Sequence, residues 1–364
     1  MISFSPSEEQ KMVITTMKQF ATDEMRKIYR ECDESGEIPN DIIKKAWEFG
    51  LIAGSIPESH GGFGSEHSAV SGALVAEELA WGDLSMAIHF LSPALAAFPI
   101  LEAGTEEQRA KYLSLFCDKA RKYATAALIE PRFGFDHNEL TTTACLDGND
   151  YVLNGEKCYV PLAAEADLMI VYASLDGATQ GFIVEKGISG LDVGEREKNM
   201  GIKALATYGL CLKDCRVPKA NRLGGEAGCD FNRILNYSRV ALSAMAVGVA
   251  KSSHEYALEY SKQRYAWGEP IASRQAIAFV LAEQHIDIEA TRPMAWEAAW
   301  ELDRGMDATK DASLTKMYAD DMVMTVTDRS VQVLGGHGYI REHPVELYLR
   351  NGRGFVTFDG MAIV

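Results

Sequence analysis

The stretch CLDGNDYVLNGEKCYV, residues 145–160, decides the fold, because it is a strand–turn–strand pattern in a chain otherwise rich in helical signals. It contains Asp147-Gly148 and Asn154-Gly155, dipeptides that tolerate the positive φ of tight turns. From about 122 to 222, short runs of Val, Ile, Thr and Tyr continue between turn residues. We therefore predict an all-β insert of about 100 residues, folded as a small barrel or sandwich.

The chain on both sides of this insert is predicted to be helical. Ser7-Glu8-Glu9 and the capping box Thr105–Gln108 begin helices in the first 115 residues. From Asp230 to about Arg350, three long helices and a short one indicate an antiparallel bundle. The expected fold is α+β, with an N-terminal all-α domain (1–118), a middle β-barrel or sandwich domain (119–225) and a C-terminal four-helix bundle (226–364).

The composition limits the possible partners. With 364 residues and 47% hydrophobic composition, the chain can bury the cores of two or three domains. Its formal charge of −16 argues against binding to nucleic acid or an anionic membrane surface. No apolar run reaches the ~18 residues of a membrane span, and the first twelve residues do not resemble a signal peptide. Seven scattered cysteines indicate reduced thiols in a cytoplasmic protein without a structural metal.

Three stretches carry residue types suited to binding a cofactor. In Arg264-Tyr-Ala-Trp267-Gly-Glu-Pro, at the end of a long helix, the guanidinium offers forked donors to phosphate and the aromatic ring can stack. An arginine that closes a helix is, taken alone, usually a partner of the helix dipole. Gln332-Val-Leu-Gly-Gly-His-Gly ends another helix in a turn that lets backbone amides approach a ligand, although a plain C-cap is the commoner reason. AALIEPRFGFD (126–136) leads into the β insert, and Glu130 is expected to fix that loop.

The last ten residues, FVTFDGMAIV (355–364), place one carboxylate, Asp359, inside an apolar run. A lone aspartate near the end of a sequence is usually solvated, so its meaning depends on the motifs before it. Together, the order α–β–α, the motifs R-x-x-W-G-x-P and Q-x-L-G-G-x-G, and the tail R-N-x-x-x-F-V-T-F-D-G resemble the acyl-CoA dehydrogenase family of flavoproteins. The resemblance covers nearly the whole chain.

This resemblance implies FAD held between the β domain and the helical bundle, in a homotetramer whose subunits each contact a neighbour's flavin. Arg264 is then expected at the pyrophosphate of the neighbour's FAD, with Trp267 in place of the family's phenylalanine. Gln275 is expected nearby, and Gln332, Gly335 and Gly336 are expected along the adenine-dinucleotide arm. The backbone of Leu128 and Ile129 is expected at the isoalloxazine ring. Tyr159, Val160 and Pro161 complete the expected cofactor contacts, where the family has the sequence W-I-T.

The implied reaction is α,β-dehydrogenation of an acyl-CoA thioester, in which a carboxylate removes the α-proton while hydride passes from the β-carbon to flavin N5. Asp359 stands at the family's glutamate base, because Y-E-G-T is here Phe358-Asp359-Gly360-Met361. The resemblance also places Arg239 beside the acyl-CoA site. Phe135, Phe358 and Gly360 complete the expected substrate contacts. Electrons are expected to pass to an electron-transfer flavoprotein.

The chain departs from the family pattern at three places. Aspartate is one methylene shorter than glutamate, about 1.5 Å of reach, and Ser238, where some members carry the base, cannot replace it. At the flavin, Ile129, Phe135 and Pro161 replace hydroxyl-bearing residues, and proline also lacks an N–H. The family usually continues with another helix beyond the base, so the residues after Gly360 are expected to fray.

Three functions fit these observations. The first, which we favour, is an FAD-dependent acyl-CoA dehydrogenase; aspartate at the base position resembles members that act on alicyclic acyl-CoA, so an alicyclic or branched acyl group is expected. The second is a flavin oxidase of the nitroalkane-oxidase kind, which also uses an aspartate base. The third is an inactive or partner subunit of a heteromeric acyl-CoA dehydrogenase, which the altered flavin contacts suggest.

Overall fold

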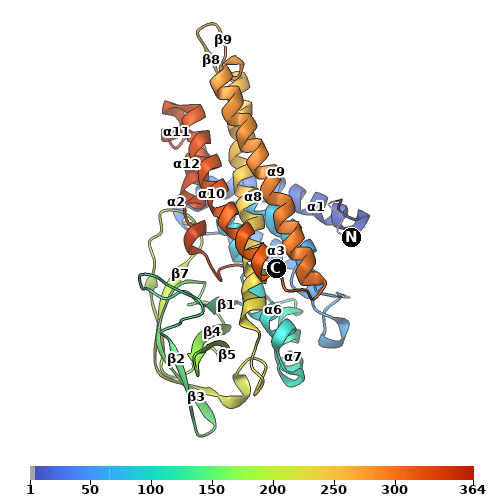
Figure 1. Cartoon of the computed structure of the whole chain (residues 1–364), viewed down its shortest axis with the longest axis vertical. Helices are drawn as coiled ribbons and strands as arrows, with labels where there is room; N and C mark the ends of the chain where they lie inside the picture. Colours follow the sequence, from blue (N-terminus) through green and yellow to red (C-terminus); the bar gives the residue numbers. More distant parts are fainter. Residues whose placement is uncertain (1–4, 65) are drawn as a thin grey trace.

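The computed structural model describes residues 5–64 and 66–364, and it shows N-terminal helices, a curled β-sheet and long C-terminal helices in that order (Figure 1). The first four residues of the predicted N-terminal domain and Ser65 lie outside the described residues. The predicted α+β architecture is therefore confirmed.

The N-terminal region is a cluster of helices whose first turns follow the expected capping chemistry. The Ser7 and Thr105 hydroxyls each accept a hydrogen bond from the backbone N–H three residues on. The side-chain oxygens of Gln10 and Gln108 in turn accept from the N–H groups of Ser7 and Thr105, which completes two capping boxes. The helices are α1 (Glu8–Phe20), continued by a π-helical turn (Ala21–Met25) into α2 (Arg26–Ser35), then α3 (Asn40–Glu48), α4 (Ala69–Gly82), α5 (Leu84–Leu91), α6 (Ala94–Ala103) and α7 (Glu106–Tyr112).

The middle domain is one seven-stranded sheet in the order β1-β4-β2-β3-β7-β6, with β5 paired to β4. The sheet curls around its own apolar core, which includes Tyr151, Phe182 and Leu210. Its strands are β1 (Ala124–Ala127), β2 (Thr143–Asp147), β3 (Asp150–Pro161), β4 (Leu168–Leu175), β5 (Ala178–Glu185), β6 (Leu191–Arg196) and β7 (Thr207–Pro218).

Only one of the two turn dipeptides in residues 145–160 forms a turn. Gly148, with φ +64°, lies in the tight connection between β2 and β3, where Asp147 pairs with Asp150. The second dipeptide lies inside β3, because the pairing with β7 shifts register between Leu153 and Gly155. Gly155 forms this bulge with φ +151°, and a Cβ there would lie 2.6 Å from Thr142. The dipeptide thus marks a kinked long strand where the sequence suggested a second turn.

The C-terminal region contains three long helices joined by short connections, α8 (Phe231–Gln263), α9 (Gln275–Asp303) and α10 (Thr309–Leu334), followed by α11 (Gly336–Tyr339) and α12 (Val345–Gly352). The connection from α8 to α9 is a small hairpin of β8 (Tyr265–Ala266) and β9 (Glu269–Pro270). Figure 1 shows this hairpin at the end of the bundle farthest from the β-sheet.

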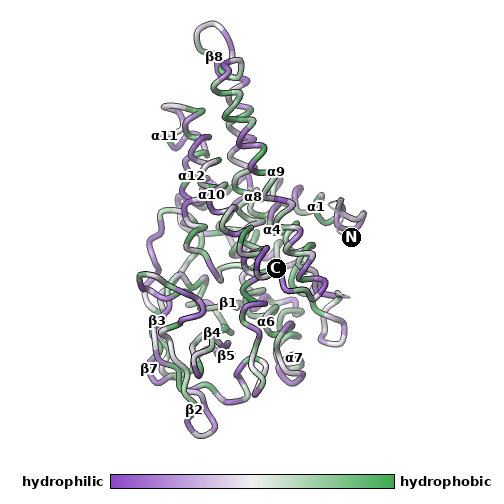
Figure 2. Tube along the Cα trace, viewed as in Figure 1, coloured by the Kyte–Doolittle hydropathy of each residue, from purple (hydrophilic) through white to green (hydrophobic). Residues whose placement is uncertain are grey.

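Buried residues of all three regions share one apolar core, to which α4, α5, α8, α10 and the last residues contribute. Hydrophobic residues recur along the long helices, whereas the β2–β3 connection is hydrophilic (Figure 2). Among the described residues, no single helix is long and apolar enough to cross a membrane, although α5 and α6, bent by 45° relative to each other, pass that test as a pair.

A buried carboxylate joins the N-terminal helices to the rest of the protein. Asp33 on α2 is 4% exposed and accepts two hydrogen bonds from the Arg350 guanidinium on α12, at 3.0 and 2.7 Å. Arg350 also donates to the Met200 carbonyl (3.0 Å), and Asn351 accepts from the Ile202 N–H (2.7 Å). Because Met200 and Ile202 precede β7, this cluster fixes three parts of the chain against one another.

We expect Asp33→Ala to lower the free energy of unfolding by about 3 kcal/mol, because it removes the buried carboxylate that pairs with both Arg350 and Arg341 and leaves Glu346 as the ion-pair partner of Arg350. Urea unfolding at pH 7 measures this. Glu34→Ala is the matched control, since Glu34 is an exposed neighbour with only a peripheral ion pair to Arg341; its effect should stay within about 0.5 kcal/mol. Equal losses in the two variants would contradict the assigned role of Asp33.

Candidate active site

Asp359 is carried by a tight turn anchored in the apolar core. A 3₁₀ turn, Phe355–Thr357, precedes it, and the Met361 N–H donates to the Phe358 carbonyl at 2.9 Å. The buried rings of Phe355 and Phe358 meet edge to face, with centroids 5.5 Å apart. A Cβ on Gly354 would lie 2.0 Å from the Phe358 ring, so this position requires glycine. The carboxylate therefore projects from a fixed piece of backbone.

Gly360 is the point where three elements meet. Its N–H donates to Ser238 Oγ on α8 at 3.1 Å, so Ser238 holds the turn. Gly360 has φ +76°, and a Cβ there would lie 2.8 Å from Leu128, the residue after β1. A glycine is thus needed both for the backbone conformation and for the close approach of Leu128.

The residues that follow Gly360 are well packed. Met361, Ala362, Ile363 and Val364 are all buried in the shared core, so the expectation that they fray is wrong. Their apolar side chains find partners on the helices around them. A cavity of about 20 Å³ remains next to Gly360, and it is lined by Leu95, Ala126, Leu128, Tyr172, Phe231, Ser238 and Ile363 among others.

A buried lysine lies beside the Asp359 carboxylate. Lys316 Nζ on α10 is 3.6 Å from Asp359 Oδ1, and it donates to both oxygens of Asp320 at 2.9 and 2.7 Å. It also donates to the Phe355 carbonyl at 2.9 Å. Oδ1 of Asp359 is buried and accepts no hydrogen bond among the described residues, while the side chain as a whole is 30% exposed. The carboxylate is therefore ionically paired at a distance and still free to accept a proton.

Arg239 on α8 is near enough to this carboxylate to interact with its negative charge, and its predicted place beside the acyl-CoA site stays a prediction. Its guanidinium donates to Ser313 Oγ at 2.8 Å and lies 3.1 Å from His137 Nε2. Burial lowers the pKa of Arg239, and the negative charge of Asp359 opposes that shift. Burial and the charge of Arg239 lower the pKa of His137, so His137 is the neutral acceptor in this contact.

The loop after β1 is held by a buried ion pair. Lys157 Nζ donates to the Leu128 carbonyl at 2.9 Å and to Glu130 at 3.0 Å, and both side chains are buried. Glu130 also accepts from the backbone N–H groups of Thr141 and Thr142, each at 2.8 Å. The expected loop-fixing role of Glu130 is confirmed.

The backbone groups expected at the flavin ring are partly engaged. The Leu128 carbonyl binds Lys157, and the Ile129 carbonyl accepts from the Cys158 N–H at 3.0 Å. This leaves the N–H groups of both residues as the donors available to a ring. Tyr159, at φ +53°, lies in a bulge of β3, and its N–H donates to Glu197 at 3.2 Å. The side chains of Val160 and Pro161 are buried, and Phe135 is half-buried.

The remaining predicted cofactor residues lie at the far end of the bundle. The two-residue loop Trp267-Gly268 between β8 and β9 has positive φ at both positions, which is the geometry of a type I′ hairpin. Trp267 is 94% exposed, and the Arg264 guanidinium forms no hydrogen bond or ion pair within the part of the chain that the structure describes. Gln275 and Gln332 are exposed, and the space around Gly335 and Gly336 is open.

The predicted site residues therefore form two groups. One surrounds Asp359, where β1, α8, α10 and the turn meet, and the other is at the β8–β9 end of the bundle (Figure 1). A single chain does not bring the two groups together. The sequence reasoning missed Lys316, Asp320 and His137. The signal for Lys316 was its helical spacing from Ala312 and Ala319, which places a lysine on the apolar face of α10.

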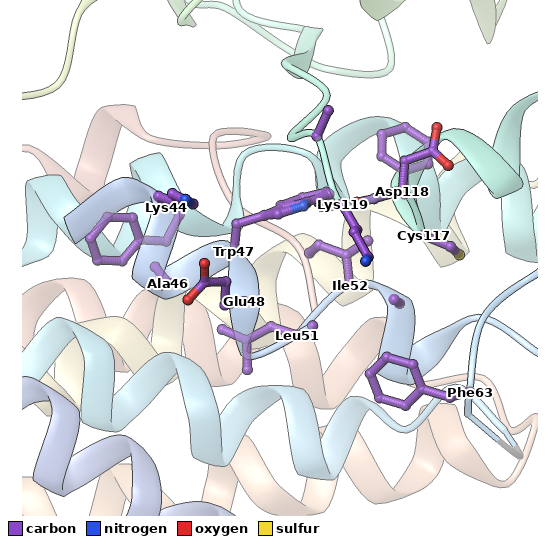
Figure 3. A pocket seen from close by; sticks show the side chains of 15 residues that line it. Lys44, Ala46, Trp47, Glu48, Leu51, Ile52, Phe63, Cys117, Asp118 and Lys119 are labelled. Atoms are coloured by element: carbon purple, nitrogen blue, oxygen red, sulfur yellow. Dashed lines mark hydrogen bonds between the residues drawn. The ribbon is translucent and has the colours of Figure 1, made fainter. Parts of the chain in front are cut away.

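A separate cavity of about 740 Å³ lies in the N-terminal region, between α3 and residues 116–120 (Figure 3). Figure 3 shows the Trp47 indole lying along it, with Lys44 and Lys119 nearby. None of the residues described around Asp359 lines this cavity.

Comparison with known proteins assigns the family. The sequence models for the N-terminal, middle and C-terminal domains of acyl-CoA dehydrogenases match residues 7–120, 125–215 and 230–362. These three segments lie in the order of the family's domains and together span most of the chain. The chain belongs to the acyl-CoA dehydrogenase family.

Individual relatives are similar over nearly their whole length. The caffeyl-CoA reductase-Etf complex subunit CarC of Acetobacterium woodii is 36% identical over 368 residues, which cover 98% of this chain and 96% of the relative. The mitochondrial short-chain specific acyl-CoA dehydrogenase of Rattus norvegicus is 33% identical over 362 residues, covering 97% and 87%. The structure of butyryl-CoA dehydrogenase from Megasphaera elsdenii superposes with a TM-score of 0.89 at 31% identity, covering 100% and 96%.

The Lys157–Glu130 pair generates a test of stability against pH. Burial alone would raise the pKa of Glu130, but the charge of Lys157 and the hydrogen bonds from Thr141 and Thr142 outweigh burial and lower it from 4.5 to about 2. A carboxyl whose pKa is lowered in the folded state stabilises the protein above pH 4.5, and this stabilisation is lost as the pH falls toward 2.

We therefore expect Glu130→Gln to lower the free energy of unfolding by about 3 kcal/mol at pH 7, and this difference from the wild type to shrink between pH 4.5 and 2. Denaturant unfolding at several pH values measures both quantities. Glu156→Gln, which removes an exposed carboxylate from the same strand as Lys157, is the control and should show no such trend. A pH-independent difference for Glu130→Gln would rule out the ion pair as its cause.

Proposed function

We propose that the protein is an FAD-dependent acyl-CoA dehydrogenase in which Asp359 removes the α-proton of the thioester. The observation that carries this proposal is the Asp359 carboxylate itself. Its buried Oδ1 accepts no hydrogen bond among the described residues and lies 3.6 Å from Lys316, and the carboxylate projects from a turn held by α8 and α10. The Asp359 N–H also makes no hydrogen bond among the described residues, so it is free to polarise the thioester carbonyl.

The residues of this chain fit FAD. At the bundle end, an unpaired Arg264 suits a pyrophosphate, the exposed Trp267 suits stacking, and the open glycines suit close approach of a dinucleotide. At the β domain, the N–H groups of Leu128 and Ile129 suit the ring, whereas Pro161 contributes no donor. The loss of one hydrogen bond there costs about 1 kcal/mol, which leaves binding intact. When bound, FAD supplies the acceptor for the hydride that leaves the β-carbon.

The charges around Asp359 serve the proton transfer. Asp359 takes the proton, and Lys316 and Arg239 each hold a positive charge near its carboxylate. The buried rings of Phe355 and Phe358 and the packed residues after Gly360 exclude water from the base of the turn.

The proposed substrates are short, branched or alicyclic acyl-CoA esters, because aspartate at the base position resembles family members that act on alicyclic acyl-CoA. The void next to Gly360 measures about 20 Å³, room for about one water molecule, and does not by itself select an acyl group. One relative is named a short-chain specific acyl-CoA dehydrogenase, which is compatible with a short acyl group, and another is named a subunit of a caffeyl-CoA reductase-Etf complex.

We expect the complete site to require a second subunit, because the Arg264 group lies at the β8–β9 end of the bundle, whereas the segment after α12 that carries Asp359 lies near the middle of the molecule (Figure 1). We propose a homotetramer in which each β domain faces the bundle end of a neighbour. An electron-transfer flavoprotein is the proposed acceptor, and one relative is named as part of a complex with Etf. The negative charge and free cysteines support a cytoplasmic location.

We expect Asp359→Asn to retain FAD and to lose substrate-dependent bleaching of the flavin, by a factor of at least about 10³, because the amide cannot accept the α-proton. The measurement is anaerobic absorbance with a panel of butyryl-, branched and cyclohexanecarboxyl-CoA. Asp321→Asn, an exposed aspartate on α10, is the control of equal charge. Unchanged bleaching in Asp359→Asn would overturn the role of Asp359.

The same panel separates the other functions. If wild-type protein binds FAD but no acyl-CoA ester bleaches it, and a nitroalkane causes oxygen uptake, the protein is an oxidase. If FAD is bound only after co-expression with a homologue, it is a partner subunit; the absence of a donor at Pro161 is the observation that favours this alternative.

Mixed tetramers test the shared site. Arg264→Ala alone should lose most of its FAD, and Asp359→Asn alone should bind FAD without bleaching. Co-expression of the two variants should restore bleaching in roughly a quarter of the sites, because a random neighbour pair combines an intact Asp359 with an intact Arg264 at that frequency. The measurement is the amount of bleached flavin per subunit in tetramers that carry both affinity tags, and no recovery would show that each site is built from one chain.

A further inference from the structure

Lys316 occupies an unusual position for a charged side chain. It lies on the buried face of α10, and its ammonium makes its hydrogen bonds to Asp320 and to the carbonyl of Phe355. Moving an ammonium out of water costs several kcal/mol, which is recovered only with good partners. A plain packing role would be filled at lower cost by leucine or methionine, so the charge itself needs a reason.

The two carboxylates near Lys316 stand in different relations to it. Asp320 is at hydrogen-bond distance, 2.7 and 2.9 Å, whereas Asp359 Oδ1 is at 3.6 Å. Asp320 therefore remains the partner of the ammonium when Asp359 becomes neutral on taking up a proton. Without Asp320, protonation of Asp359 would leave a buried cation alone. The arrangement permits Asp359 to change charge without disrupting the lysine.

We propose that Lys316 is a positioning residue for Asp359, and that Asp320 tunes its effect. Through the Phe355 carbonyl, Lys316 fixes the start of the turn that carries Asp359. Through its charge, it draws Oδ1 toward α10 and favours the ionised carboxylate. Oδ2, which is not among the buried oxygens without a partner, is then the atom that faces accessible space. This inference rests on the proposed role of Asp359 as the proton acceptor.

Other charged groups face Asp359 from the elements packed against the turn. Lys316 and Asp320 come from α10, and Arg239 comes from α8. His137, from the loop after β1, also feels the charge of Asp359 and has the exposed Asp136 beside it. Arg239 and His137 are unchanged in the variants proposed below, so a shift between variants reports on the α10 pair.

The test is a pH titration of Asp359 by infrared difference spectroscopy on the purified protein without substrate. The carboxyl band of protonated Asp359 is assigned by its absence in Asp359→Asn. In Lys316→Met, the midpoint should rise by about one pH unit or more, because an opposite charge within 4–6 Å is lost. In Asp320→Asn, the midpoint should fall, because the ammonium is left with Asp359 alone and a like charge is removed.

Opposite shifts in these two variants are the expected signature, because loss of packing alone would not move the two midpoints in opposite directions. Lys316→Arg should restore the midpoint toward that of the wild type. Lys310→Met, at an exposed lysine of the same helix, and Asp321→Asn are the matched controls and should not move it. Unchanged midpoints, or shifts of the same sign in both variants, would overturn the proposal. If Lys316→Met does not fold, the lower Asp359 midpoint expected in Asp320→Asn still tests the proposal.

The rate of flavin bleaching should change in line with the shift of the Asp359 midpoint. For a rise of one unit, Lys316→Met should bleach its flavin about tenfold more slowly than the wild type at a pH below both midpoints, and the difference should vanish at high pH. A loss of rate that is equal at every pH would assign Lys316 to holding the backbone only and would overturn the charge role. If none of the acyl-CoA esters bleaches the flavin of the wild type, the proposed function fails, while the infrared titration still tests the pairing of Lys316 with Asp359.

Discussion

The buried ion pair between Lys157 and Glu130 is the interaction on which the site depends. It fixes the loop after β1 by binding the Leu128 carbonyl on one side and the Thr141 and Thr142 amides on the other. Leu128 then reaches the surface of Gly360, where a side chain would prevent contact. One ion pair thus sets the backbone available to a flavin ring and one wall of the turn that carries Asp359.

The sequence predicted those features that depend on local chemistry. The helix start at Ser7, the capping box at Thr105, the long helices and the β2–β3 connection follow from side chains within a few residues of one another. It could not predict that Asn154-Gly155 is a bulge, because the same glycine conformation serves a turn or a kinked strand and only the pairing with β7 decides. The fraying expected after Gly360 was wrong for a related reason, since burial of those side chains depends on partners far away in the sequence.

The residues of the candidate site likewise divide into those that a local sequence pattern reveals and those that it does not. Asp359, Arg239 and the bundle-end motif were found because each belongs to a recognisable stretch of sequence. Lys316 and Asp320 were not found, because their effect comes from the position of α10 beside the turn, which no local pattern reports. His137 is linked to the site by its contact with Arg239, across 102 residues, and by the charge of Asp359. Residues that act through another residue are in general the ones that sequence reasoning does not identify.

The shorter aspartate imposes a structural requirement that the turn satisfies. A side chain with one methylene fewer has a shorter reach, so the backbone must place its carboxylate at the α-carbon of the substrate and hold it there. The turn is fixed on both sides of Asp359, by Lys316 at the Phe355 carbonyl and by Ser238 at the Gly360 N–H. The shorter side chain also has one rotatable bond fewer and loses less conformational entropy when it is held. An aspartate base is therefore compatible with this fold to the extent that these two contacts determine the position of the backbone between them.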